Sequence, residues 1–194
     1  MIDDKLLKLT APNLIACEGV DAKYFLIYYL EHLKKIDCMY NNFQVEDFGG
    51  NTELSKFIKI LPLLPDFNHL KTLTIVRDSE PNSKKAIQSV QNTLKNCNFA
   101  VPDLCCQIMK PSDKNHNVHI GFTLFPSFTD DCSGSLEDLC LEIVTSSESK
   151  SLLKIVDKTI DSVNKVVFRL KRPHKNRLHT YLSLTTDFVG LKIG

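Results

Sequence analysis

Short apolar runs alternate along the chain with longer segments whose apolar residues recur at helical spacing. The runs at residues 14–17, 43–48, 73–76 and 118–125 predict β-strands. The intervening segments predict helices at residues 21–35, 52–61, 83–97, 136–144, 151–169 and 176–184. Because strands and helices alternate, we expect an α/β fold with a central, mostly parallel sheet covered by helices on both faces.

Two segments depart from this simple pattern. In the helix predicted at 21–35, apolar residues occur on nearly every side of the helix, so we expect other parts of the chain to cover it well. Between residues 99 and 117, two prolines and a polar stretch interrupt the pattern, which predicts a loop.

The bulk composition is that of an ordinary globular protein. The chain has 194 residues, of which 43% are hydrophobic and 24% charged, and no apolar run approaches the roughly 20 residues of a membrane span. The N-terminus lacks a signal-peptide pattern, and the seven cysteines show no framework spacing. We therefore expect a cytoplasmic protein with no membrane association. We expect a single domain over residues 1–194, with an acidic core at 13–146 and a helical, basic C-terminal part at 151–194.

The net charge of +1 conceals a basic segment near the C-terminus. Between residues 162 and 186 there is no acid, and six basic residues lie at positions 165, 169, 171, 172, 175 and 177. Such a segment is typical of a contact with a polyanion such as nucleic acid. A solvated helix face is an equally good interpretation, and the sequence leaves both open.

Acidic residues cluster at three places where a predicted strand or loop gives way to a helix. The clusters are Glu18 with Asp21, Asp78 with Glu80, and Glu137 with Asp138. In an open α/β sheet the carboxyl ends of parallel strands line one crevice, so these side chains are expected to converge. Carboxylates gathered there repel one another unless a cation lies between them, and Mg²⁺ prefers such oxygen ligands together with waters and a phosphate. The clusters predict a metal-dependent phosphate site.

Several of these acids also have a structural interpretation. Asp21 is placed to cap the helix that follows it, and Glu80 to favour the dipole at a helix start. Ser135 and Asp138 have the spacing of a capping box, which leaves Glu137 less well explained.

Glu18 is the acid that is hardest to explain structurally. It ends a buried strand, where a carboxylate costs free energy unless it is paired or bound to metal. Gly19 lets the backbone turn or approach a ligand. Arg77 is placed to pair with Asp78 or Glu80. No phosphate-binding loop, dinucleotide fingerprint or serine-nucleophile motif occurs.

The segments 15–21, Ile-Ala-Cys-Glu-Gly-Val-Asp, and 74–80, Thr-Ile-Val-Arg-Asp-Ser-Glu, resemble the signature of Toprim-like domains. That signature is an apolar strand ending in Glu-Gly and a later strand ending in Asp-x-Asp. More narrowly, the chain is similar to a family of small, stand-alone bacterial Toprim-like proteins of unknown function. Segments 47–51, 134–140 and 179–182 and residues 190–191 extend this similarity over nearly the whole chain.

The resemblance implies a Toprim-like three-layer domain and a role for each motif residue. Glu18 would be the general acid/base or a metal ligand, and Asp78 and Glu80 would hold Mg²⁺ or Mn²⁺, with Glu80 in place of the second Asp. Relatives of this fold often supply a late basic residue, for which Lys175 and Arg177 are the candidates. The further candidates are Asp21 and Glu137 as metal ligands, and Gly19, Gly49 and Gly50 as ligand-binding glycines.

The function implied by the resemblance is metal-dependent phosphoryl transfer, most simply cleavage of DNA or RNA, in phage defence or nucleic-acid metabolism. The alternative is a non-catalytic module that binds a nucleotide or a partner. Because the Toprim nucleases of the overcoming-lysogenization-defect type join this domain to an ATPase, an ATPase partner acting in trans is also expected. The sequence leaves the oligomeric state open.

Overall fold

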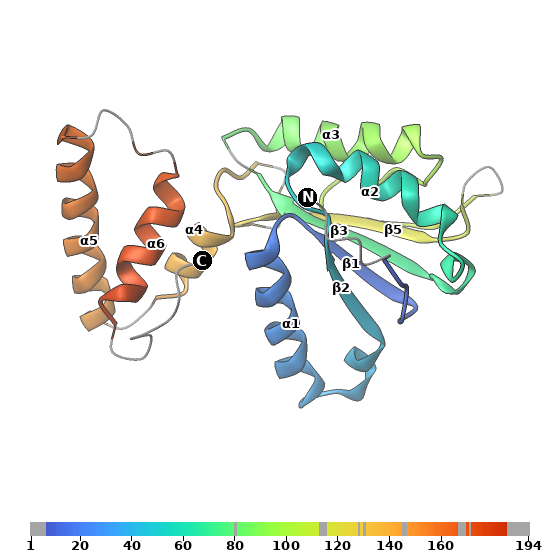
Figure 1. Ribbon diagram of the computed structural model, residues 1–194, viewed down its shortest axis with the longest axis horizontal. Helices are drawn as coiled ribbons and strands as arrows, with labels where there is room; N and C mark the ends of the chain where they lie inside the picture. The colour runs from blue at the N-terminus through green and yellow to red at the C-terminus, as the bar shows by residue number, and fades with distance from the viewer. Residues whose placement is uncertain are drawn as a thin grey trace. The chain divides into compact units, whose positions relative to one another are not determined.

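The four apolar runs predicted as strands, together with one short strand that was not predicted, form a five-stranded sheet in the computed structural model (Figure 1). Its strands are β1 (Asn13–Cys17), β2 (Phe43–Asp47), β3 (Thr72–Asp78), β4 (Ile108–Met109) and β5 (His119–Phe125). Their order in the sheet is β2-β1-β3-β5-β4. The first four strands in that order run parallel, and only β4 pairs antiparallel with its neighbour. The predicted α/β fold with a mostly parallel sheet is therefore confirmed.

The structure describes residues 7–79, 81–112, 116–127, 129, 131–144, 147–166, 170 and 172–185. The chain divides into two compact units, residues 1–133 and 134–194, and each is described by itself. The sheet belongs to the first unit. Whether the chain folds as one domain stays a prediction.

Helices cover both faces of the sheet in the first unit. The helices α2 (Leu54–Ile60) and α3 (Ser83–Asn96) lie on one face, and α1 (Val20–Lys34) lies on the other (Figure 1). Asn82 caps the N-terminus of α3, because its side chain accepts a hydrogen bond from the backbone N–H of Lys85 at 3.0 Å. Short 3₁₀ helices connect these elements at 38–42, 51–53, 61–63 and 67–69.

The larger core lies between the sheet and the pair α2 and α3. Alternate residues of a strand point to the same face. Leu14 and Ala16 of β1, with Leu73 and Ile75 of β3, are buried in this core. The helices contribute Leu54, Ile58, Val90 and Leu94. The same alternation assigns the next residues along, Glu18 and Arg77, to the face covered by α2 and α3.

Helix α1 is less covered than its composition predicts. Only Ala22 and Leu30 are buried, whereas Val20, Tyr24, Tyr28 and Tyr29 are each more than half exposed. The expectation of a well-covered helix is wrong because tyrosines, which carry a polar hydroxyl, supply much of its apolar character and tolerate exposure.

The predicted loop between residues 99 and 117 contains strand β4. This strand has two residues and pairs with Ile120 and Gly121 of β5. Two residues are too few to produce a detectable alternation, so the sequence pattern does not reveal it.

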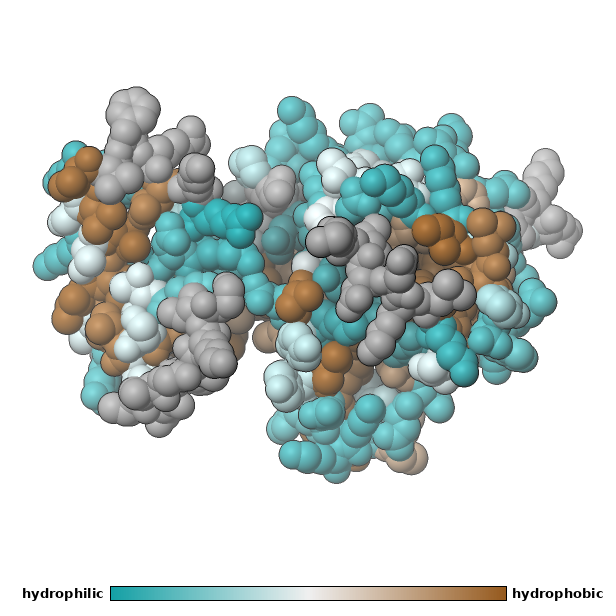
Figure 2. All heavy atoms as spheres, viewed as in Figure 1, coloured by the Kyte–Doolittle hydropathy of each residue, from teal (hydrophilic) through white to brown (hydrophobic). Residues whose placement is uncertain are grey.

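Among its described residues, the second unit contains three helices, α4 (Leu136–Glu142), α5 (Ser147–Val166) and α6 (Pro173–Ser183). Leu141, Val156 and Tyr181 form its buried apolar cluster, with one residue from each helix. Figure 2 shows further hydrophobic side chains exposed along α5, which include Ile155 and Val166. Over the described part of the chain, no helix combines the length and apolar character that a membrane crossing requires.

Candidate functional site

The parallel pairing of β1 and β3 brings the first two acidic clusters to adjacent strand ends. Cys17 pairs with Val76, and the backbone N–H of Glu18 donates to the carbonyl of Val76 at 2.9 Å. Asp78 is the last residue of β3 and pairs with Phe125 of β5. Because neighbouring strands lie about 4.8 Å apart, the backbones of Glu18 and Asp78 are close together. This edge of the sheet is the candidate site.

Glu18 forms an ion pair with Arg77 inside the protein. Arg77 Nε lies 3.4 Å from Glu18 Oε2, and the two side chains are 3% and 12% exposed. Arg77 Nε and Nη1 are buried and have no hydrogen-bond partner among the residues that the structure describes. The sequence interpretation had placed Arg77 beside Asp78 or Glu80, whereas the ion pair seen here is with Glu18. The ion pair arises because Glu18 and Arg77 both follow residues of the face covered by α2 and α3, and the register of β1 and β3 sets them side by side.

Asp47, at the end of β2, holds two glycine turns beside the site. Its Oδ1 accepts hydrogen bonds from the backbone N–H groups of Gly19, at 2.8 Å, and of Gly49, at 2.6 Å. Both glycines have positive φ angles, +89° and +88°, which suit glycine alone among common residues. Gly50 has a φ angle of −83°, so its backbone does not require glycine. Sequence reasoning missed this role of Asp47, for which its spacing two residues before Gly49 was the available signal.

Asp21 lies in the first turn of α1 and is exposed. The N-cap of α1 is Gly19, with no side-chain cap, so the interpretation of Asp21 as the cap is wrong. The helix begins at Val20, two residues earlier than that interpretation needs. An acid in the first turn still interacts favourably with the helix dipole.

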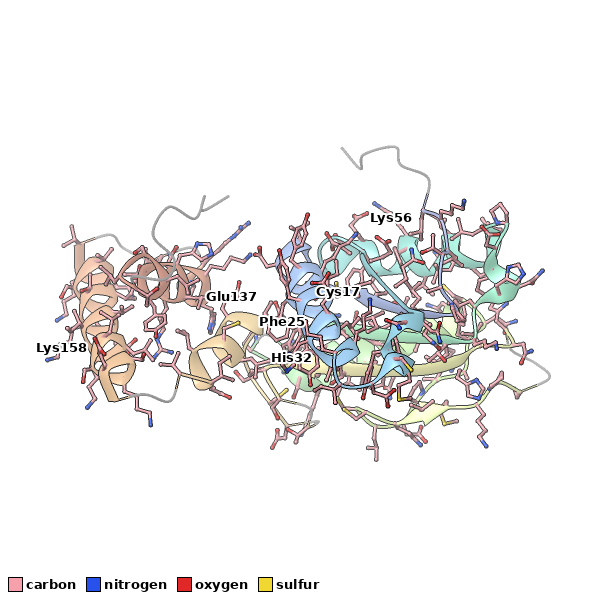
Figure 3. All side chains as sticks on the ribbon, turned by 90° about the horizontal axis from the view of Figure 1, so that it is seen from below. Cys17, Phe25, His32, Lys56, Glu137 and Lys158 are labelled. Atoms are coloured by element: carbon pink, nitrogen blue, oxygen red, sulfur yellow. The ribbon has the colours of Figure 1, made fainter. Side chains whose placement is uncertain are left out.

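Cys17, labelled in Figure 3, is fully buried at the end of β1. Burial, with a smaller effect from the nearby Asp47 carboxylate, raises the pKa of its thiol to about 12. The sulfur lies 3.4 Å from the backbone carbonyl of Glu46. Because the thiol stays protonated at neutral pH, Cys17 is a poor nucleophile, and we assign it a structural role beside the site.

The third acidic cluster lies at the start of α4, in the second unit. Ser135 and Asp138 form the predicted capping box, and Asp138 also lies 2.8 Å from Nδ1 of His174. Glu137, labelled in Figure 3, is buried, and its Oε1 lies 3.5 Å from Nζ of Lys175. Both acids of this cluster therefore have a basic partner from α6.

The two candidate late basic residues form ion pairs within the second unit. Arg177 donates to both carboxylate oxygens of Asp157, at 2.6 and 3.0 Å. This contact raises the pKa of Arg177 above its usual value. Lys175 is the residue that pairs with Glu137. A catalytic role for either residue stays a prediction.

The carboxylates at the strand ends are of the ligand type that a hydrated Mg²⁺ ion takes. Mg²⁺ keeps several waters and commonly takes one or two protein carboxylates, which Glu18 and Asp78 can supply. Within the described residues, no group of three or more His, Cys, Asp or Glu side chains is arranged to hold a metal ion. Five positions of the prediction lie outside the described residues: Glu80, Arg169, Lys171 and the late pair 190–191.

Residues 12–188 match the family described as "Protein of unknown function (DUF3226)", and the chain belongs to this family. The match includes the strand-end site and all three helices of the second unit. No curated protein and no solved structure matches the chain. The resemblance to Toprim-like domains stays a prediction.

Proposed function

We propose that this family member is a Toprim-type phosphoryl-transfer enzyme that depends on Mg²⁺ or Mn²⁺, most simply a nuclease acting on DNA or RNA. The observation that supports the proposal is the adjacency of Glu18 and Asp78 at the carboxyl ends of two paired parallel strands. Ligands of open α/β sheets bind at this end of the strands. Two carboxylates there favour a cation and, through it, a phosphate.

The metal would be held by Glu18 and Asp78, with Glu80 as a further ligand. When bound, such an ion neutralises charge on a phosphate and lowers the pKa of an attacking water. Glu18 is also the candidate general acid/base. The backbone N–H groups at the start of α1, just after Gly19, favour an anionic phosphate nearby. Gly19 and Gly49 keep the backbone compact around that position.

Asp21 and Glu137 have weaker claims as metal ligands. Asp21 is exposed in the first turn of α1, where it could bind the metal ion through a water molecule. Glu137 would first have to leave Lys175.

The alternative function is a non-catalytic module that binds a nucleotide or a partner. It is favoured by the ion pair between Arg77 and Glu18, because a carboxylate neutralised by arginine does not require a metal. In this case the fold would be kept and the crevice would bind without chemistry.

Calorimetric titration with MnCl₂ tests the metal half of the proposal. We expect wild-type protein to bind Mn²⁺ and the double variant Asp78→Asn/Glu80→Gln to lose most of this binding. Glu31→Gln is the matched control, because Glu31 is exposed on α1 and lies outside the site. The absence of Mn²⁺ binding by wild-type protein would support the non-catalytic alternative.

Cleavage of a panel of single- and double-stranded DNA and RNA tests the catalytic half. We expect Mn²⁺-dependent cleavage of at least one substrate, and loss of cleavage in the double variant but not in Glu31→Gln. An ATPase partner is part of the proposal as a regulator in trans. Adding an ATPase encoded beside this chain should then change the cleavage rate.

A further inference from the structure

We propose that Arg77 is the internal counter-ion of Glu18, and that a divalent metal must compete with Arg77 for this carboxylate. The inference rests on the proposed metal-dependent function, and it specifies how metal binding at that site is limited. It concerns the affinity of the site for metal, which is measurable without any substrate.

Arg77 occupies a strand position where an apolar side chain would be expected. Leu73 and Ile75 precede it on the same face of β3, and both are fully buried in the core. Arg77 is itself only 2% exposed. A charged guanidinium at such a position costs free energy unless an anion compensates it. The presence of arginine is therefore explained by its charge and not by apolar packing.

Glu18 is the anion that compensates this charge. It follows β1, the neighbouring strand, and its backbone N–H is bonded to the carbonyl of Val76, the residue before Arg77. The two side chains meet at 3.4 Å with little exposure to solvent. Each charge therefore makes the burial of the other tolerable.

The contact with Arg77 compensates the charge of Glu18 but is not a pair of parallel hydrogen bonds. Strong arginine–carboxylate pairs make two parallel hydrogen bonds, as Arg177 and Asp157 do in the second unit. In contrast, neither Nε nor Nη1 of Arg77 has a hydrogen-bond partner among the described residues. The contact of Arg77 with Glu18 therefore rests on charge more than on directed hydrogen bonds from Nε and Nη1.

A metal ion at Glu18 would lie within a few ångströms of the guanidinium. Like charges at that range repel strongly where water is largely excluded, and solvent screening reduces but does not abolish the effect. Removing the charge of Arg77 is therefore expected to tighten Mn²⁺ binding by about 10- to 100-fold. The charge of Arg77 therefore lowers the affinity of the site for metal, so that the site fills only at higher metal concentrations.

The test is calorimetric titration of the full chain with MnCl₂ in four forms: wild type, Arg77→Met, Arg77→Lys and Glu18→Gln. We expect Arg77→Met to bind about 10- to 100-fold more tightly than wild type. Arg77→Lys, which keeps the charge, should stay within about threefold of wild type. Glu18→Gln should bind more weakly than wild type. Mn²⁺ should also raise the melting temperature of Arg77→Met more than that of wild type.

Unchanged or weaker binding by Arg77→Met, with clear binding by wild type, would overturn the inference and leave the proposed function standing. The absence of Mn²⁺ binding in every form would overturn both. If Arg77→Met does not fold without metal, the double variant Glu18→Gln/Arg77→Met provides the second measurement. The double variant carries neither charge of the pair, so it should be more stable to urea than Arg77→Met. A double variant no more stable than Arg77→Met would overturn the counter-ion role.

Discussion

The ends of β1 and β3 and the start of α4 carry similar acidic motifs but hold their acids differently. At the start of α4, the Asp138 carboxylate accepts hydrogen bonds from Ser135 and lies beside His174, while Glu137 lies beside Lys175. At the strand ends, Glu18 is buried against Arg77, whose Nε and Nη1 have no hydrogen-bond partner among the described residues. An acid that closes a capping box is explained by the fold, whereas a buried ion pair with atoms that lack a hydrogen-bond partner is a candidate for function. The comparison assigns Asp138 to structure and Glu18 to the candidate site.

The largest expected effect is on nucleic-acid cleavage, which should fall far more for a substitution at the strand ends than for one at the start of α4. Asp78→Asn should reduce Mn²⁺-dependent cleavage by about 10³-fold, because it removes a ligand of the ion that stabilises the transition state. Glu137→Gln should reduce cleavage by less than about threefold if Glu137 serves mainly to pair with Lys175. Initial rates under saturating Mn²⁺ provide the measurement. Equal losses in both variants would show that the start of α4 belongs to the active site.

The next effect compares a thiol from each region. Burial raises the pKa of Cys17 to about 12 and, together with the charge of Glu137, that of Cys140 to about 11. While the pH lies below the pKa of a thiol, its reactive thiolate fraction therefore increases about tenfold for each unit by which the pH is raised. Iodoacetamide labelling at pH 8, followed by mass spectrometry, should modify the exposed Cys38 first and Cys17 last.

Labelling that is repeated at pH 9 should be faster at Cys17 and Cys140, with Cys17 still the slower of the two. Rapid labelling of Cys17 at pH 8 would show that the end of β1 opens readily. The proposed compact site would then be in doubt.

The longer strands and helices were predictable because each has a periodic signal, whereas the two-residue strand β4 has none. The capping box at Ser135 was visible as a short local motif. The adjacency of Glu18 and Asp78 followed from parallel pairing alone. The partner of Arg77 was not predictable, because it depends on the register between β1 and β3. Asp47 was missed for a similar reason, since its two acceptor contacts join turns that lie 30 residues apart, at Gly19 and Gly49.

A smaller effect is expected on the free energy of unfolding, from substitutions at the turns and caps of the two regions. Gly19→Ala should cost about 1–2 kcal/mol, because residue 19 has a φ angle of +89° and the new Cβ meets no atom within 4 Å. Gly50→Ala is the control, at an ordinary φ angle, and should change stability by less than about 0.5 kcal/mol. Asp138→Ala should cost about 1 kcal/mol through loss of the capping box. Urea unfolding measures all three, and a neutral Gly19→Ala would contradict the strain assigned to that turn.

The smallest expected effect tests the basic segment as a nucleic-acid contact. Lys165 and Arg172 are exposed, whereas Lys175 and Arg177 have acidic partners, Glu137 and Asp157. A phosphate contact requires a cation that is available to it. The pair Lys165→Gln/Arg172→Gln should therefore lower the slope of log affinity against log salt by about 1–2. The pair Lys175→Gln/Arg177→Gln should lower it by less than about 1, because these charges are already partly neutralised. Binding of labelled DNA and RNA between 50 and 200 mM salt, about the range over which such contacts weaken, gives the slopes. If both pairs of substitutions leave the slope unchanged, the segment is a solvated helix face and substrate must be held at the strand ends alone.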